Sequence, residues 1–308
     1  MFKRLLSAFG VGGPSVDTVL DSPHATPGQA LAGEVRIQGG SADVEIGEVV
    51  LSLVTRAESE RGGHEYAATV EFQRFVVGTR VRVAAGQPLA LPFQLPIPWE
   101  TPITAVGSTH LHGMDIGVRT ELVIAGAPDK GDLDPISVHP LPSQDRVLDA
   151  FGELGFQFRK ADVEIGRIHG AHQELGFYQE IEFYPPAQFA GGLNQVELTF
   201  IAGPDDLLVV LEADKRGGMF AAGGDAFGHF GMSHQEAQRA DWTSVVGQWL
   251  TRVAQRGGVP SHGHRGHHER RGPGMGAVVG GVAAGVVGGM VLGEVFEDFG
   301  GGDFEGGE

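Results

Sequence analysis

Residues 89–104 read Leu-Ala-Leu-Pro-Phe-Gln-Leu-Pro-Ile-Pro-Trp-Glu-Thr-Pro-Ile-Thr and carry the strongest signal about architecture. Every second residue at the start of this stretch is apolar, which places four side chains on one face of an extended strand: Leu89, Leu91, Phe93 and Leu95. Pro92 removes a backbone donor, so it predicts an edge strand or a bulge. Further prolines then favour an extended, stiff arm that reaches Trp99. A plain proline-rich loop is the alternative that composition allows.

The chain around this stretch, residues 15–126, consists of short apolar runs separated by Gly and Pro. Alternating apolar positions predict a strand buried on one face, at Leu31, Gly33, Val35 and Ile37. Residues 44–55 are apolar on both parities, which is typical of a central strand covered on both sides. Residues 111–124 supply the closing strand. We therefore predict an antiparallel β-sandwich for residues 1–127.

Residues 128–136 are polar and turn-rich, and they are interpreted as the connection to a second domain at 137–256. There Ser143 is a candidate N-cap for a short helix. Five strands are then predicted, at 156–168, 175–184, 195–202, 207–213 and 227–233. The second domain is thus predicted to be another β-sandwich.

An amphipathic helix follows these strands. One stripe at helical spacing carries its apolar side chains, Trp242, Val245, Val246, Trp249, Leu250 and Val253. We expect this helix to cap the second domain, and docking into a partner's groove is the alternative.

The hexapeptide Ala-Asp-Val-Glu-Ile-Gly occurs twice, at 42–47 and at 161–166. Such identity indicates an internal duplication. The neighbouring residues do not align, so coincidence competes with that interpretation.

Both ends of the chain carry candidate interaction segments. The N-terminal stripe Phe2, Leu5, Leu6 and Phe9 predicts a short helix that packs on its own domain or docks on a membrane surface or partner.

Residues 257–308 form a tail rich in His, Gly and acidic residues. Residues 274–293 contain no charge, and a glycine recurs at every fourth position, at Gly281, Gly285, Gly289 and Gly293. This glycine spacing favours self-association of a helix, and the length of the segment is compatible with a weak membrane span. Disorder is the third interpretation.

A histidine tract precedes that segment, at His262, His264, His267 and His268. Dense imidazoles bind transition metals weakly, but no carboxylate or thiolate completes the ligand set. A solvated linker is the preferred interpretation, and no cofactor is predicted. His110 and His112, two residues apart, are expected to share an exposed strand face.

The composition limits the classes of function. The net charge of −17 argues against a nucleic-acid partner, because phosphate binding needs clustered Lys and Arg. The absence of Cys excludes disulfides, thiolate metal sites and Cys nucleophiles. The start of the chain does not fit a signal peptide, so we expect a cytoplasmic protein.

Scattered segments resemble the bacterial sporulation-control protein family, which has an arrestin-like fold. The 89–98 stretch and the 118–124 strand resemble arrestin-fold proteins, and the rest of the resemblance rests on residues 2–6, 16–20, 134–140, 147–150, 154–156, 241–242 and 249–250. The resemblance spans residues 1–255 and implies two tandem arrestin-like β-sandwiches without a catalytic centre. It also implies a regulatory role in sporulation or related development.

We therefore expect a non-enzymatic adaptor that binds other proteins, with a homo-oligomer and a tail-mediated membrane contact left open. The alternative is a membrane-associated structural or trafficking protein anchored by the glycine-rich tail. A hydrolase or metal enzyme would need histidines and carboxylates that converge in one pocket.

Overall fold

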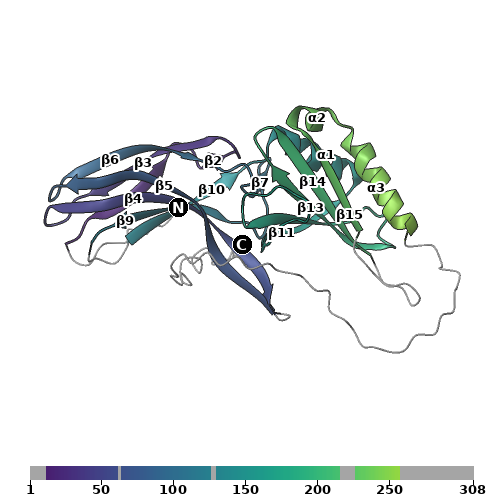
Figure 1. The fold of residues 1–308 in the computed structure, drawn as a ribbon, viewed down its shortest axis with the longest axis horizontal. Coiled ribbons are helices and arrows are strands. Elements are labelled where there is room, and N and C mark those ends of the chain that lie inside the picture. The colour runs from purple at the N-terminus through teal and green to yellow at the C-terminus, as the bar shows by residue number, and fades with distance from the viewer. Residues whose placement is uncertain (1–11, 62–63, 126–129, 216–225, 257–308) are drawn as a thin grey trace, which may run out of the picture. The chain divides into compact units, whose positions relative to one another are not determined.

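The structure is a computed structural model that describes residues 12–61, 64–125, 130–215 and 226–256. These residues are mostly β-strand, in curled sheets, and helices occur in the C-terminal part (Figure 1). The predicted all-β class is confirmed.

The smaller main sheet has the strand order β1–β3–β6, with all pairs antiparallel: β1 (Ser15–Leu20), β3 (Ala30–Gln38) and β6 (Pro88–Pro96). β6 lies at the edge, as Pro92 predicted. Its alternation is also confirmed, because Phe93 and Leu95 are buried while the residues between them are exposed. β3 buries Leu31, Val35 and Ile37 on one face, as the pattern predicted.

The larger sheet has the order β15–β14–β13–β12–β11–β4–β9–β10–β2, and β5 pairs with β4 beside this path. Its first part consists of β2 (His24–Ala25), β4 (Val44–Arg61), β5 (His64–Val83), β9 (Ile116–Val123) and β10 (Lys130–Val138). The second part consists of β11 (Gln157–Ile165), β12 (Phe177–Tyr184), β13 (Leu193–Ala202), β14 (Asp206–Lys215) and β15 (Ala226–Ser233). A parallel pair, Glu164 with Glu58, joins the two parts.

The first hydrophobic core lies between the smaller sheet and the first part of the larger one. It contains side chains from both layers, among them Val35, Ile37, Phe93 and Leu95 opposite Ile46, Leu51, Leu53, Val118 and Leu122. β4 is buried on both parities and pairs on both edges, which confirms the predicted central strand. The described residues of the first half therefore form the predicted sandwich.

The proline arm after β6 passes from the first core to the second. Ile97 is buried in the first core, and Ile103 is buried in the second. Between them, Trp99 packs against the second cluster and stacks on His234 with ring centroids 5.9 Å apart. Gly28, at φ 77°, has no room for a side chain, because a Cβ there would lie 2.4 Å from the Trp99 ring.

Most of the predicted connection at 128–136 is a β-strand. From Lys130 onward it belongs to β10, which pairs antiparallel with β9 along its length. A polar, apolar-poor sequence is compatible with a strand here because the ladder of backbone hydrogen bonds does not depend on side-chain hydrophobicity. The predicted domain bounds themselves stay a prediction.

A sandwich prediction places the second core between two sheets, and the structure departs from this on one side of the core. Strands β11 to β15 form one antiparallel layer of it, and most of the opposing layer is helical: α1 (Pro142–Leu154), α2 (His234–Arg239) and α3 (Trp242–Arg256). The small ribbon of β7 (Ala105–Val106) and β8 (Thr109–His110) packs against the same core. α3 buries its predicted stripe there, so the prediction of a capping helix is confirmed.

The N-terminus of α1 corrects a detail of the sequence analysis. Leu141, and not Ser143, is the N-cap, because Pro142 fits the first helical position, where a missing N–H costs no hydrogen bond. Ser143 lies inside the first turn, where its Oγ is 2.8 Å from Nδ1 of His234. Thus Ser143 ties α1 to α2.

Candidate functional site on the polar face of strands β11 to β14

The interaction and metal candidates named from the sequence lie outside the described residues: Phe2, Leu5, Leu6, Phe9, His262, His264, His267, His268, Gly281, Gly285, Gly289 and Gly293. They stay predictions, as do the membrane span and the self-association of 274–293. Within the part of the chain that the structure describes, no helix is long and apolar enough to cross a membrane.

His110 and His112 do not share a strand face, because β8 ends at His110. Both are exposed, and the carbonyl of His112 accepts a hydrogen bond from the backbone N–H of Ala161 at 3.0 Å. This segment therefore contacts β11 through its backbone.

The sheet formed by β11 to β14 has two unlike faces. Alternate residues such as Val163, Ile181 and Leu198 point into the second core. The residues between them are largely acidic, and we call this opposite side the acidic face: Asp162, Glu164, Glu180, Glu182, Glu197, Glu212 and Asp214. This face was not predicted, although acidic residues at every second position of the predicted strands indicate it.

The strand register brings like charges together on this face. Asp162 on β11 lies directly opposite Glu180 on β12. One row along, Glu182, Glu197 and Glu212 follow one another across β12, β13 and β14. Like charges directly opposite each other destabilise a sheet, so the acidic face needs compensation.

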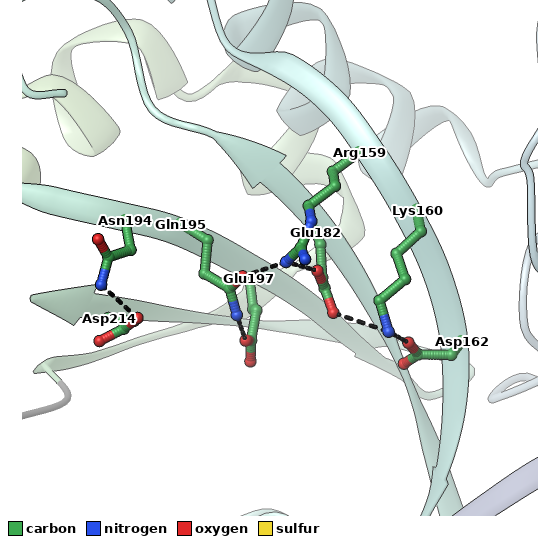
Figure 2. A network of polar contacts seen from close by, with 8 residues as sticks. All are labelled: Arg159, Lys160, Asp162, Glu182, Asn194, Gln195, Glu197 and Asp214. Carbon is green, nitrogen blue, oxygen red and sulfur yellow. Dashed lines mark hydrogen bonds and ion pairs between the residues drawn. The ribbon is translucent and has the colours of Figure 1, made fainter.

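Basic side chains from β11 supply part of that compensation (Figure 2). Lys160 Nζ lies 2.6 Å from Asp162 Oδ2 and 3.2 Å from Glu182 Oε1. Arg159 Nη1 lies 2.6 Å from Glu182 Oε2 and also donates to Gln195. Both cations therefore converge on Glu182, which is only 6% exposed.

Amide side chains extend the network toward β14 (Figure 2). Gln195 donates from Nε2 to Glu197 Oε1 at 2.7 Å, and Asn194 donates from Nδ2 to Asp214 Oδ2 at 2.8 Å. Amides solvate a carboxylate without neutralising it. Cations and amides thus both contribute to a network that extends from β11 to β14.

The electrostatics of the face show in its pKa values. Burial, together with the charges of Glu197, Asp162, Glu164 and Glu212, raises the pKa of Glu180 to about 8. Burial and the same acidic surroundings raise the pKa of Tyr178. Burial alone would lower the pKa of Lys160, but hydrogen bonds and charge from Asp162 and Glu182 outweigh it, so that pKa is raised. Lys160 therefore stays charged at every physiological pH.

Asp162, Glu164 and Glu180 form the group of carboxylates that could hold a metal ion in the described part of the chain. One oxygen from each lies within 4.8 Å of the others. The group contains no imidazole or thiolate, so it suits a hard cation better than zinc or copper.

A second acidic cluster lies on β10. Burial, with smaller contributions from the charges of Asp132 and Asp17, raises the pKa of Asp134 to about 7. Asp132 Oδ2 accepts the backbone N–H of Thr18 at 3.0 Å, whereas Asp134 Oδ2 has no hydrogen-bond partner among the described residues. Within the described residues, the group of possible metal ligands lies on β11 and β12 and does not include these aspartates.

Comparison with known proteins assigns the family. A family profile described as "SpoOM protein" matches residues 2–217. The "Sporulation-control protein spo0M" of Bacillus subtilis (strain 168) is 32% identical over 216 residues, which cover 70% of this chain and 81% of that protein. A crystal structure of Spo0M, sporulation control protein, from Bacillus subtilis matches with a TM-score of 0.69 and 27% identity, over 79% of this chain and 99% of that one. The resemblance seen in the sequence is confirmed, and the chain belongs to the SpoOM protein family.

Proposed function

We propose that this protein is a non-enzymatic, arrestin-like regulatory adaptor that acts in the cytoplasm, in sporulation or a related developmental step, by binding other proteins. Family membership supports the developmental part, since the curated relative is named a sporulation-control protein. The binding surface is the acidic face of β11 to β14, and the partner is a protein with a basic surface.

The carboxylate row Glu182, Glu197 and Glu212 carries this proposal. Each pair of like charges directly opposite one another costs a few tenths of a kcal/mol, on the order of 0.2–1 kcal/mol. The cations Lys160 and Arg159 converge at the β11 and β12 end of the row. A basic protein surface would offset the repulsion at the other end and add electrostatic steering to the encounter.

Charge reversal tests the proposal. In the full chain, Glu197→Lys with Glu212→Lys reverses the row on β13 and β14. The matched control, Glu34→Lys with Glu45→Lys, makes the same change in net charge on β3 and β4. Both variants replace the chromosomal gene in the source organism, beside a deletion strain.

We expect the acidic-face variant to reproduce the developmental defect of the deletion. It should also lose the proteins that the immobilised wild-type chain retains at low salt, while the control keeps them. Retention by wild type should fall steeply as salt rises. Equal retention and equal development in both variants would rule out the acidic face as the binding surface. A deletion strain with normal development would rule out the developmental role.

A further inference from the structure

Three carboxylates from two neighbouring strands converge at one end of the acidic face. Asp162 and Glu164 are two residues apart on β11 and share its outer side, and Glu180 on β12 lies directly opposite Asp162. One oxygen of each lies within 4.8 Å of the other two. Oxygens that bind one calcium ion at about 2.3–2.6 Å are necessarily separated by about this distance or less.

The Asp162 carboxylate is only partly satisfied by the protein. Asp162 is 8% exposed, and its Oδ2 is held by Lys160 Nζ at 2.6 Å. Its Oδ1 is buried, and among the described residues it has no hydrogen-bond partner. A buried carboxylate oxygen without a donor is costly, so its position within a carboxylate cluster indicates a ligand.

The charges around the cluster do not balance. Lys160 bridges Asp162 and Glu182, and Arg159 is paired with Glu182. Neither of these printed ion-pair cations contacts Glu180, so ionisation of Glu180 directly opposite Asp162 creates excess negative charge there. A divalent cation removes this excess and supplies the partner that Oδ1 lacks.

We propose that Asp162, Glu164 and Glu180 bind one hard divalent cation, of the Ca²⁺ or Mg²⁺ class. The all-oxygen donor set excludes a preference for soft metals. Two antiparallel strands hold the three ligands, so the cation fixes β11 to β12 at the end where β11 meets β4. This site does not depend on the proposed binding of a basic protein.

Calorimetric titration of the full-length, EDTA-treated chain with CaCl₂ or MgCl₂ tests the site. Wild type should show one saturable site, and Glu180→Gln should weaken it about tenfold or more, because affinity follows the charge of the ligand set. The matched control is Glu45→Gln, which removes a carboxylate from the first copy of the hexapeptide, on β4. Because all variants keep the acidic tail, the difference between them isolates this site from weak binding elsewhere.

A terbium(III) titration adds a readout of position. Tyr178 lies opposite Glu164 in the register, so its excitation should sensitise a lanthanide in the cluster. Tyr178→Phe also removes a hydrogen bond with Glu180, so it should lower the sensitised emission while Ca²⁺ binding stays saturable, and Glu164→Gln should weaken both. Far-ultraviolet circular dichroism in EDTA verifies that each variant folds.

Three results would overturn the site. The first is the absence of saturable binding by about 1 mM of either cation, the weak end of the usual range. The second is an affinity in folded Glu180→Gln equal to that of wild type. The third is an equal loss in Glu45→Gln. Cation binding that survives while partner capture fails would separate this site from the proposed function.

Discussion

The two copies of Ala-Asp-Val-Glu-Ile-Gly meet opposite environments. In the first copy Ile46 is fully buried in the first core, and Glu45 is exposed. In the second copy Ile165 is 49% exposed, and Asp162 is buried. Duplicated strands would keep the face that they bury, so this difference favours coincidence over duplication.

The cross-strand partners of the two copies explain what each carboxylate does. Glu45 lies opposite Arg82 and forms an ion pair with it at 3.1 Å, whereas Glu164, at the same position of the second copy, lies opposite Tyr178. The aspartates differ too, because Asp43 Oδ1 accepts the backbone N–H of Ala85 at 2.8 Å, whereas Asp162 lies directly opposite Glu180. Six identical residues thus form an ordinary strand start in one place and an unbalanced acidic cluster in the other.

Truncation of the two isoleucines should give the largest difference between the copies. Ile46→Ala removes a fully buried side chain and should cost about 2–5 kcal/mol of unfolding free energy. Ile165→Ala, at a half-exposed site, should cost less than about 0.5 kcal/mol. Urea denaturation followed by Trp fluorescence measures both. Equal costs would mean that the two copies do not differ in burial.

Two aspartates on β10 also differ in their hydrogen bonds, and this difference gives a smaller effect. The pKa of Asp134 rises from 3.8 to about 7 on folding, so between these values the folded state binds a proton that the unfolded state releases. Stability from this group is therefore present at low pH, falls as the pH rises from about 4 to 7, and is constant above that.

Asp134→Asn should remove this fall and stabilise the protein at pH 8 by roughly 1 kcal/mol, which is about 2–4 °C in Tm. Thermal melts at pH 5 and pH 8 provide the measurement. Asp43→Asn, at an exposed and hydrogen-bonded carboxylate, is the control and should not change the pH dependence. A difference between pH 5 and pH 8 as large in Asp134→Asn as in the wild type would contradict the assignment, because the raised pKa of Glu180 contributes equally to both.

These contrasts show what the sequence could and could not predict. Local alternation predicted the buried face of β3, and the stripe around Trp249 predicted the capping helix α3, because each pattern acts within one element. The meeting of Asp162 and Glu180 depends on the register of β11 with β12, which includes an irregularity between Phe158 and Lys160. No local pattern reports such a register.

The helices that cover part of the second core were not predicted, for a related reason. Strand patterns at 156–233 predicted that the second domain is a sandwich, but they do not say what covers the sheet. α1 and α3 come from opposite ends of that segment and pack together on one core. The β10 strand was missed because its polar residues are held by pairing with β9.

The smallest test places a like charge opposite a carboxylate of the first copy. Arg82→Glu places a like charge opposite Glu45 and mimics the Asp162 and Glu180 pair. Because the Arg82 side chain is 86% exposed, solvent screens the repulsion, and the cost should stay below about 0.5 kcal/mol. Arg82→Gln provides the control that loses the ion pair without adding repulsion, and urea denaturation at low and high salt measures both. A cost above about 1 kcal/mol that salt does not reduce would contradict this expectation. It would mean that like charges opposite each other are as destabilising at an exposed pair as at a buried one. Burial would then not explain the cost of the acidic face.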